Sequence, residues 1–489
     1  MKSWLTDKTA LIGALAFSLL LVLGAFNDFL LIAVLPIVVI LGWWSIKRLD
    51  LYIGFILLAV PLSINLQELE VTSLGLYMPT EPLLFGALII FLFRFLKGWP
   101  VDKRIFSHPI TLVIGSMMVW MALTSVTSYD PLVSLKFTTS RAWFVVSFFF
   151  FLGHIMLHKP EFRERMIMLL LFPLCIVVVY TVIRHAGHDF SKHAGHWMMK
   201  PFFKDHTSYG AVLAMMLPPS IALLIKKDRP TLTRLFLAIA TVIISVGLVL
   251  SFTRAAWLSL AGVGALFVIM KLGIKLKTLV GISLIVLTLI LSNFDAILIS
   301  MERNKQDSSD SLMEHVESIS NVSSDDSNLE RLNRWSCAMS LFQERPLVGW
   351  GPGTYQFVYA PFQKSELKTV ISTNNADGGN AHSEFLGPLA EQGIPGMLCM
   401  ILLIWWASNV GFKLWNKMQD NDEKNLAVSV YLGLMTYFIH GVVNNYLDTD
   451  KVSAPFWGFI ALLVVFDLEL KRKERNLEVG QDLLKPTTK

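Results

Sequence analysis

Long apolar runs recur along almost the whole chain and are separated by short polar segments. A helix that crosses a lipid bilayer needs about 20 consecutive, mostly apolar residues. The pattern therefore predicts an all-α polytopic membrane protein with 12–14 transmembrane helices. The fourteen candidate spans are 9–26, 29–44, 51–66, 80–96, 109–126, 141–157, 166–183, 207–225, 235–250, 255–270, 278–294, 394–412, 425–443 and 452–466.

The loops between the spans predict how the chain is oriented. Cytoplasmic loops of membrane proteins carry an excess of Lys and Arg. With the N-terminus in the cytoplasm, the cytoplasmic segments hold 27 of the 42 Lys and Arg residues, so both termini are expected there. The predicted organisation is an N-terminal bundle of about eleven helices (1–293), a large outer loop (294–393), C-terminal helices (394–470) and a cytoplasmic tail (471–489).

Composition supports this class of protein. Hydrophobic residues make up 54% of the 489 positions and charged residues 16%, whereas soluble proteins carry about a quarter charged residues. These values exclude a soluble enzyme and a disordered chain. The net charge of +5 then reflects topology rather than nucleic-acid binding. Two of the three cysteines, Cys175 and Cys399, lie in apolar runs and Cys337 lies in a polar segment, which argues against a disulfide framework.

Several kinds of chemistry lack their usual motifs. The sequence has no P-loop, no HExxH zinc motif and no GxSxG nucleophile elbow. No acidic or basic residue falls in the middle of a predicted span, where ion-coupled transporters usually place one. Functional residues are therefore sought in the outer loops, because loops on a rigid scaffold often carry function.

The first outer motif is Ser251–Trp257, which joins two spans and places Arg254 at the membrane face. One interpretation is an interfacial arginine whose guanidinium extends toward the headgroups, with Trp257 in the aromatic belt. The other is an anion clamp, because a guanidinium binds phosphate bidentately and stays charged. The sequence alone gives the two interpretations about equal weight.

The second outer motif lies in the large loop. Residues 329–342 have helical spacing, with Leu332, Trp335, Met339 and Phe342 on one apolar stripe. Arg331 and Arg334 are one turn apart, so both can point toward the membrane. The competing interpretation is an amphipathic helix that lies on the bilayer. The glycines at 349, 351 and 353 predict a tight turn whose backbone could approach a phosphate.

The third outer motif is His382-Ser383, followed after nine residues by Gly393-Ile-Pro-Gly396. A single histidine is most often structural. His382, however, is expected at the membrane surface and within reach of the arginines of the second motif.

Two further outer segments are weaker candidates. The histidines of the repeated His-Ala-Gly-His units at 185–188 and 193–196 could bind zinc or copper, but no Cys or carboxylate cluster completes a metal site. A polar interfacial loop is favoured there. The acidic, serine-rich stretch 301–330 is interpreted as a solvated spacer or lid.

Outer arginines at the lipid surface with one histidine, and without metal or nucleotide motifs, fit one kind of reaction. A substrate activated in the lipid, such as a polyprenyl-diphosphate-linked glycan, brings its own leaving group. Arginines would stabilise the charge that develops on the diphosphate. A neutral histidine could remove the proton of an acceptor hydroxyl, and nearby arginines would lower its pKa and keep it neutral.

The motifs around Arg254, Arg331 and His382 resemble those of the bacterial O-antigen ligase and O-antigen polymerase superfamily. The segments Ser125–Lys136 and Phe203–Gly210 also resemble parts of that family, and the similarity extends over roughly 120–465. The spacing between His382 and the glycines after it is the most specific part. The apparent extra helix pair and the 301–330 insert depart from the usual form.

The resemblance implies a glycosyltransferase C-type helical fold in the bacterial inner membrane with a large periplasmic loop. It implies inverting, metal-independent transfer, without a cofactor, of a glycan from undecaprenyl diphosphate to a lipid A–core sugar or a growing glycan. The catalytic role would fall on His382. Binding of the donor diphosphate would fall on Arg254 and Arg331, with Arg334 as a further neighbour.

Three other functions remain open from the sequence. An O-antigen or exopolysaccharide polymerase and a protein O-oligosaccharyltransferase would use the same donor with a different acceptor. From a different class, a polysaccharide flippase or transporter fits the number of helices.

Overall fold

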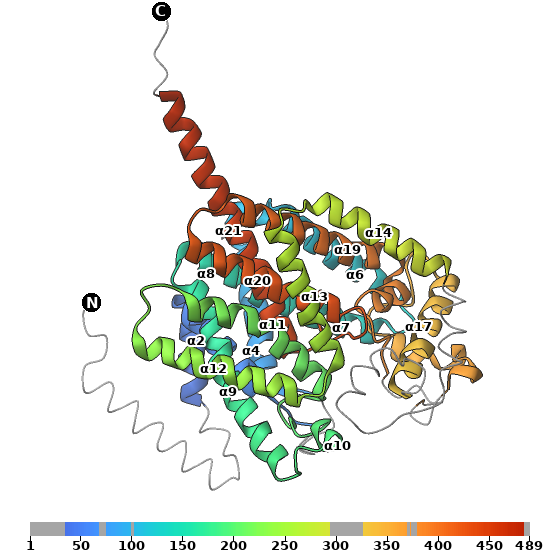
Figure 1. The fold of residues 1–489 in the computed structure, drawn as a ribbon. Coiled ribbons are helices and arrows are strands. Elements are labelled where there is room, and N and C mark those ends of the chain that lie inside the picture. Colours follow the sequence, from blue (N-terminus) through green and yellow to red (C-terminus); the bar gives the residue numbers. More distant parts are fainter. Residues whose placement is uncertain are drawn as a thin grey trace, which may run out of the picture. The chain divides into compact units, whose positions relative to one another are not determined.

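The structure is a computed structural model that describes residues 35–67, 75–98, 102–293, 326–368, 372 and 379–483. The described segments are almost entirely helical (Figure 1). Eight of their helices are long and apolar enough to cross a membrane. Two compact units divide the chain, Met1–Phe55 and Ile56–Lys489. In the first unit, the structure describes α2 (Leu35–Lys47) and most of α3 (Leu49–Ala59).

The second unit holds the remaining elements. They are η2 (Val60–Leu62), β1 (Ile64–Asn65), β2 (Tyr77–Met78), α4 (Thr80–Leu96), α5 (Lys103–Phe106), α6 (Pro109–Val126), α7 (Pro131–Phe144), η3 (Val145–Phe151), α8 (Leu152–His158), α9 (Phe162–Ala186), α10 (Lys192–Gly195), α11 (His206–Ile225), α12 (Thr231–Leu250), α13 (Arg254–Lys271), α14 (Leu276–Ser292), α17 (Asp326–Glu344), α18 (Tyr355–Val358), η4 (Ala360–Phe362), η5 (Ser365–Leu367), α19 (Leu386–Lys417), α20 (Asn421–His440) and α21 (Asp450–Leu483).

The predicted all-α polytopic fold class is confirmed. The candidate span 9–26 lies outside the described residues, and every other candidate span overlaps a helix. The single ladder among the described residues joins β1 and β2 in antiparallel register, with Ile64 opposite Met78 and Asn65 opposite Tyr77. The total of 12–14 crossings stays a prediction.

Three helices extend well beyond the apolar runs that predicted them. Asp130 caps α7 by accepting from the amides of Leu132 and Val133, so this helix begins at Pro131 rather than at 141. It continues through the π-helical η3 into α8, giving one apolar helix over Pro131–His158. The hydroxyl of Ser383 accepts from the amides of Phe385 and Leu386 at the start of α19. At the C-terminus, α21 continues to Leu483, past the predicted boundary at 470.

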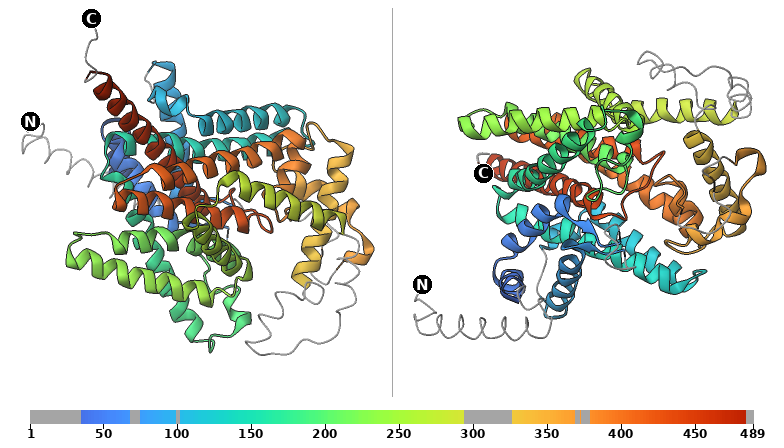
Figure 2. Two further views of the ribbon diagram at one scale, coloured as in Figure 1. Left: turned by 45° about the horizontal axis from the view of Figure 1, so that its top comes forward. Right: turned by 90° about the horizontal axis from the view of Figure 1, so that it is seen from below.

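The interior of the second unit is built from long helices that pack side by side (Figure 2). Helix α11 packs against α20, α12 and α13, α19 packs against α6, and α21 packs against η3 and α8. The largest fully buried side chains include Trp457 and Phe459 of α21 and Phe148 and Phe149 of η3. Extensive burial of apolar surface around α11 and α21 gives the outer segments a rigid base.

Helix α19 is interrupted at Gly393, which has φ of 70° and ψ of −166°. The break frees backbone groups that other segments then satisfy. The indole of Trp120 donates to the carbonyl of Gln392 at 2.8 Å, and the amide of Ile394 donates to the carbonyl of Pro346 at 3.0 Å. A Cβ at position 393 would lie 2.3 Å from the carbonyl oxygen of Leu347. Only glycine fits both this φ and this close approach.

Helix α17 confirms the helix predicted over 329–342, but its buried face differs from the predicted apolar stripe. The buried positions are Asn333, Arg334, Cys337, Ala338 and Leu341, whereas Met339 is 41% exposed. Helix α17 packs on the first part of α19 and on η4 and η5, with Tyr355 and Tyr359 completing a small core. The polar residues of this face are therefore buried against other segments of the protein.

We predict that Gly393→Ala destabilises the protein, because a Cβ there combines a left-handed φ with a backbone overlap. Strain of this kind costs roughly 1–3 kcal/mol. Thermal unfolding of the detergent-solubilised protein should show a lower midpoint than wild type. Gly264→Ala in α13 is the matched control, because a Cβ at that position meets no atom within 4 Å. An unchanged midpoint for Gly393→Ala would contradict this account of the break.

Candidate active site

A cavity of about 910 Å³ brings together residues that are far apart in the sequence. We call it the larger cavity. It is lined by the β1–β2 hairpin, the start of α11, one face of α17, the segment 379–382 and the segment 444–451 between α20 and α21. Two of the predicted site residues, Arg331 and His382, line this cavity. The structure therefore joins the second and third outer motifs in one site.

The backbone of His382 adopts φ of 47°, a left-handed conformation in which histidine is enriched among non-glycine residues. Two neighbours hold this conformation. The amide of His382 donates to Oδ1 of Asn380 at 3.1 Å, and its carbonyl accepts from the indole of Trp335 at 3.4 Å. Among the described residues the imidazole ring has no hydrogen-bond partner, so its nitrogens are available to a ligand in the cavity.

Glu384 anchors the His382 segment to the loop that follows α20. Its carboxylate accepts hydrogen bonds from the amides of Tyr446 and Leu447, at 2.9 and 3.0 Å, and from the hydroxyl of Tyr437. Its own amide donates to the carbonyl of Gly441 at 2.8 Å. Burial raises the pKa of Glu384. These bonds hold His382 close to the segment 444–449, and both line the larger cavity.

The surroundings of His382 favour the neutral imidazole. Burial lowers its pKa from 6.5 to about 4, and the positive charges of Arg331 and Arg334 act in the same direction. The carboxylates of Glu330 and Asp205 oppose this shift without overcoming it. At neutral pH, His382 is therefore uncharged and able to accept a proton.

The two arginines of α17 have different surroundings. Arg331 lines the larger cavity, and its Nε donates to the carbonyl of Val443 at 3.2 Å. Arg334 is buried, and its Nε lies 2.6 Å from a carboxylate oxygen of Glu330. The guanidinium of Arg334 also lies 3.9 Å from the centre of the Tyr359 ring. The side chain of Arg334 is thus packed behind the cavity wall.

Arg254 is the first residue of α13. The hydroxyl of the preceding residue, Thr253, donates to the carbonyl of His206 at 2.9 Å and so ties this corner to the start of α11. Within the described part of the chain, Arg254 is not among the residues that line the larger cavity. The structure therefore brings Arg254 next to the element that borders the site, while Arg331 and His382 line the site itself.

The first turn of α11 forms another wall of the larger cavity. Asp205 caps this helix by accepting from the amides of Thr207 and Ser208 at 2.9 and 2.8 Å. The hydroxyls of Thr207 and Tyr446 are hydrogen-bonded to each other. This contact joins the start of α11 to the loop after α20.

Lys451 also lines the larger cavity, but its ammonium group is bound by neighbouring residues. Its ammonium donates to the carbonyl and hydroxyl of Ser63 at 2.9 and 2.6 Å and lies 3.5 Å from Asp450.

The glycine run after α17 forms the predicted tight turn, but protein backbone at Gly349 and side chains at Gly351 and Gly353 occupy the space that was expected for a phosphate. Gly349, Gly351 and Gly353 all have positive φ. A Cβ on Gly349 would lie 2.2 Å from the carbonyl carbon of Glu391, and one on Gly351 would lie 2.0 Å from the hydroxyl of Ser128. The glycines therefore allow the turn to lie directly against α19 and the start of α7.

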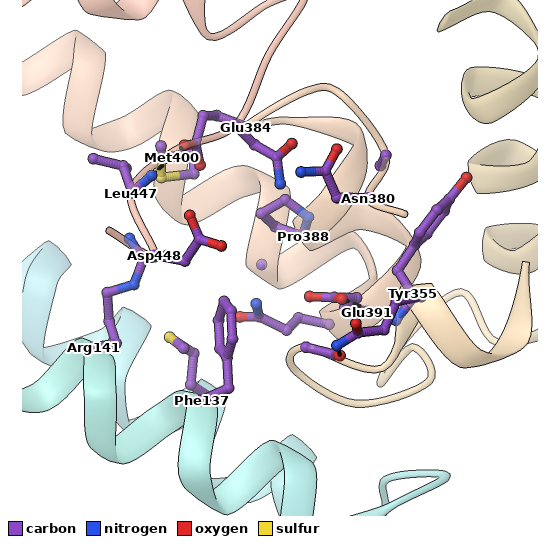
Figure 3. Close-up of a pocket in the computed structure, with 18 of the residues that line it drawn as sticks. Phe137, Arg141, Tyr355, Asn380, Glu384, Pro388, Glu391, Met400, Leu447 and Asp448 are labelled. Carbon is purple, nitrogen blue, oxygen red and sulfur yellow. Dashed lines mark hydrogen bonds between the residues drawn. The ribbon is translucent and has the colours of Figure 1, made fainter. Parts of the chain in front are cut away.

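A second cavity of about 250 Å³ adjoins the first, and we call it the smaller cavity (Figure 3). The two cavities share the lining residues Lys204, Gly379, Asn380, Asn445 and Asp448. Figure 3 shows Phe137 and Arg141 of α7 on one side, Asp448 beside them, and Glu391 and Tyr355 across the cavity. The smaller cavity thus meets the larger one at Gly379 and Asn380, just before His382 in the sequence.

Sequence reasoning missed Arg141, Lys204, Asn445 and Asp448. Arg141 is the first residue of a predicted span, and Asp448 lies four residues before another. A search for charges at the ends of predicted spans could therefore have found both residues. Lys204 lies inside the segment Phe203–Gly210, which was singled out without assigning it a role. Nothing in the local sequence pattern marks Asn445.

The histidines of the 185–196 region are engaged with their own loop. Nε2 of His185 lies 2.9 Å from the carbonyl oxygen of Ser191, and Nδ1 of His188 lies 3.2 Å from that of Arg184. The rings of His196 and His206 stack with centroids 4.2 Å apart. In the part of the chain that the structure describes, no three His, Cys, Asp or Glu side chains form a group that could hold a metal ion.

Comparison with known families identifies the segment around this site. Residues 239–401 match the family model described as O-Antigen ligase, which covers Arg254, Arg331 and His382. No curated protein matches the chain. The matched segment contains Arg331 and His382, the two predicted site residues that line the larger cavity. Over this segment, the chain is similar to the O-antigen ligases, the family that its sequence motifs resemble.

Proposed function

We propose that the protein is an O-antigen ligase-like glycosyltransferase that transfers a glycan from undecaprenyl diphosphate to a sugar hydroxyl of lipid A–core. The observation that carries the proposal is that a neutral His382 and the cation of Arg331 line one cavity. Both residues lie in the segment that matches the O-antigen ligase model. Similarity to this family supports glycan transfer of the ligase or polymerase type, and the choice of donor and acceptor is ours.

In the proposed reaction, His382 acts as the general base. It removes the proton of the acceptor hydroxyl while the hydroxyl oxygen forms a bond to C1 of the donor sugar. The bond between C1 and the diphosphate oxygen breaks, and undecaprenyl diphosphate leaves with the negative charge. Arg331 stabilises that charge as it develops. Attack opposite the leaving group inverts the configuration at C1.

The other assigned arginines act less directly. Arg334 lowers the pKa of His382 from behind the cavity wall. Arg254 would engage the donor where the lipid-linked diphosphate enters beside α11. The reaction needs no metal ion or cofactor in this proposal, because the diphosphate is already an activated leaving group. The site would face the periplasm from the bacterial inner membrane, with both termini in the cytoplasm.

The function is tested by transfer with purified protein, a polyprenyl-diphosphate-linked glycan and lipid A–core in the presence of a chelator. A ligase should form glycan-bearing lipid A–core. In cells, deletion of the gene should remove long chains from lipopolysaccharide and leave the lipid-linked polymer. A core that bears a single repeat would instead indicate a polymerase, and a normal profile with under-glycosylated proteins would indicate a protein O-oligosaccharyltransferase.

We predict that His382→Ala lowers the transfer rate roughly 10²- to 10⁴-fold, the usual contribution of a positioned general base. In wild type, transfer should survive as the pH falls through 6.5 and be lost only near pH 4, because the base must be neutral and its pKa is lowered to about 4. The measurement is the single-turnover rate across this range. A loss centred near 6.5, or full activity of well-folded His382→Ala, would contradict the assignment.

We predict that Arg331→Gln weakens binding of the donor and shifts the pH dependence. Removal of the positive charge should raise the pKa of His382, so activity should be lost at a higher pH than in wild type. The KM for the donor should rise, because a charge-assisted contact to the diphosphate is lost. Arg165→Ala, at an exposed position that lines neither cavity, should behave as wild type. An unchanged pH profile in Arg331→Gln would count against this role.

A further inference from the structure

The smaller cavity is lined by polar groups that the fold leaves available. Among the described residues, no hydrogen bond or ion pair joins Arg141, Lys204 or Asp448 to another side chain, although all three line this cavity and Asp448 accepts from its own amide. The guanidinium of Arg141 lies 5.6 Å from the centre of the Phe137 ring. Asp448 and Lys204 are exposed, and both also line the larger cavity. Their hydrogen-bonding capacity is therefore directed at the cavity.

Asn445 supplies an independent observation at the same place. Its Oδ1 is buried and has no hydrogen-bond partner among the described residues. A buried acceptor without a partner costs about 1–3 kcal/mol, so native proteins rarely retain one without a reason. Asn445 lines both cavities at their junction. A ligand hydroxyl at the junction would satisfy this atom.

We propose that the smaller cavity binds the terminal sugar residue of the acceptor glycan and directs one of its hydroxyls toward His382. The inference rests on the proposed function and adds a binding site for the second substrate. Asp448 and Asn445 would accept from sugar hydroxyls, and Arg141 would donate to them. Phe137 and Tyr355 provide aromatic surface for the apolar face of the ring.

The charges of the cavity select against other ligands. Three acidic side chains, from Glu384, Glu391 and Asp448, line it beside the two cations Arg141 and Lys204, and burial raises the pKa of Glu384. A carboxylate at Asp448 would repel a diphosphate, and the cations would repel a metal ion or an amine. A neutral ligand with many hydroxyls avoids both penalties, since each hydroxyl both donates and accepts.

The size of the cavity favours the acceptor over the donor. About 250 Å³ is below the roughly 300–1,000 Å³ of most ligand pockets, which suits a single sugar residue. The reacting residue of the acceptor is a chain end and can enter a small pocket. The reacting sugar of the donor is joined to a diphosphate on one side and a glycan on the other. It therefore fits the larger cavity, where Arg331 lies.

The rest of the pocket is held in place by the fold. Oε1 of Glu391 accepts from the amide of Tyr355 at 3.0 Å, which fixes the turn that carries Tyr355. Glu384 is held by the loop after α20. Substitution of Asp448 or Arg141 would therefore remove ligand contacts and leave the hydrogen bonds of Glu384 and Glu391 in place, which makes these two positions suitable for a test.

The test compares Asp448→Asn and Arg141→Gln with wild type while each substrate is varied in turn. The KM for a lipid A–core acceptor should rise roughly tenfold or more, with little change in the KM for the donor and in kcat, as expected for lost ground-state binding. Glu344→Gln is the matched control, because this exposed carboxylate at the end of α17 lines neither cavity. Thermal unfolding confirms that each variant is folded.

Two outcomes would overturn the inference. A rise in the donor KM alone would assign the pocket to the donor sugar, and unchanged KM values for both substrates would leave the pocket without a role in binding. Calorimetric titration with core oligosaccharide released from lipid A provides a readout without transfer. If wild type forms no product, the proposed function fails, whereas weaker binding of this oligosaccharide to Asp448→Asn would still support the pocket.

Discussion

The carboxylate of Glu384 is the group on which the geometry of the site depends. A buried carboxylate is costly unless hydrogen bonds compensate for the lost water. Glu384 meets this requirement by accepting from two consecutive backbone amides, those of Tyr446 and Leu447, and from the hydroxyl of Tyr437. Because it lies two residues after His382, these bonds fix the base relative to the loop after α20. Asn445 and Asp448 belong to that same loop, so both cavities share one anchored wall.

Close backbone contacts provide the second constraint. The turn at 349–353 lies against α19 because its glycines leave no side chain between the two backbones. The break at Gly393 turns the start of α19 and lets Pro346 and Trp120 satisfy the freed backbone groups. The glycines that gave the sequence its family-like spacing therefore shape the walls of the cavities, and two of them, Gly353 and Gly396, line the smaller cavity. Their spacing is specific because several segments meet there at once.

The long helices could be predicted from the sequence because burial in lipid demands long apolar runs and internally satisfied backbones. Their ends could not, because they depend on caps such as Asp130 and Ser383 and on polar turns that extend beyond the apolar part. The buried face of α17 was also predicted wrongly. Apolar spacing selected Met339, whereas tertiary contacts bury Asn333 and Arg334 through hydrogen bonds and an ion pair.

Part of the site could be predicted because its chemistry is rare in an outer loop. Arg331 and His382 stand out there, and the structure brings them to one cavity. Arg141 and Asp448 could not be found in the same way, because charges at the ends of spans are common and most have an interfacial role. Only the fold shows that these two line one cavity and make no hydrogen bond to another side chain among the described residues. A charge at the end of a span indicates a binding site only when the structure shows which cavity it lines.

In the proposal, the larger cavity would hold the donor and the smaller cavity the acceptor, and this division bears on the choice of acceptor. Under the proposed function, every member of the superfamily that uses a lipid-linked diphosphate needs a cation such as Arg331 and a base such as His382, whatever the acceptor is. The larger cavity would then be the shared part of the reaction. Differences between a ligase and a polymerase would arise in the smaller cavity, where Arg141, Asn445 and Asp448 meet the acceptor. Discrimination would come chiefly from Asn445, because a sugar that leaves its buried Oδ1 unpaired would lose about 1–3 kcal/mol of binding.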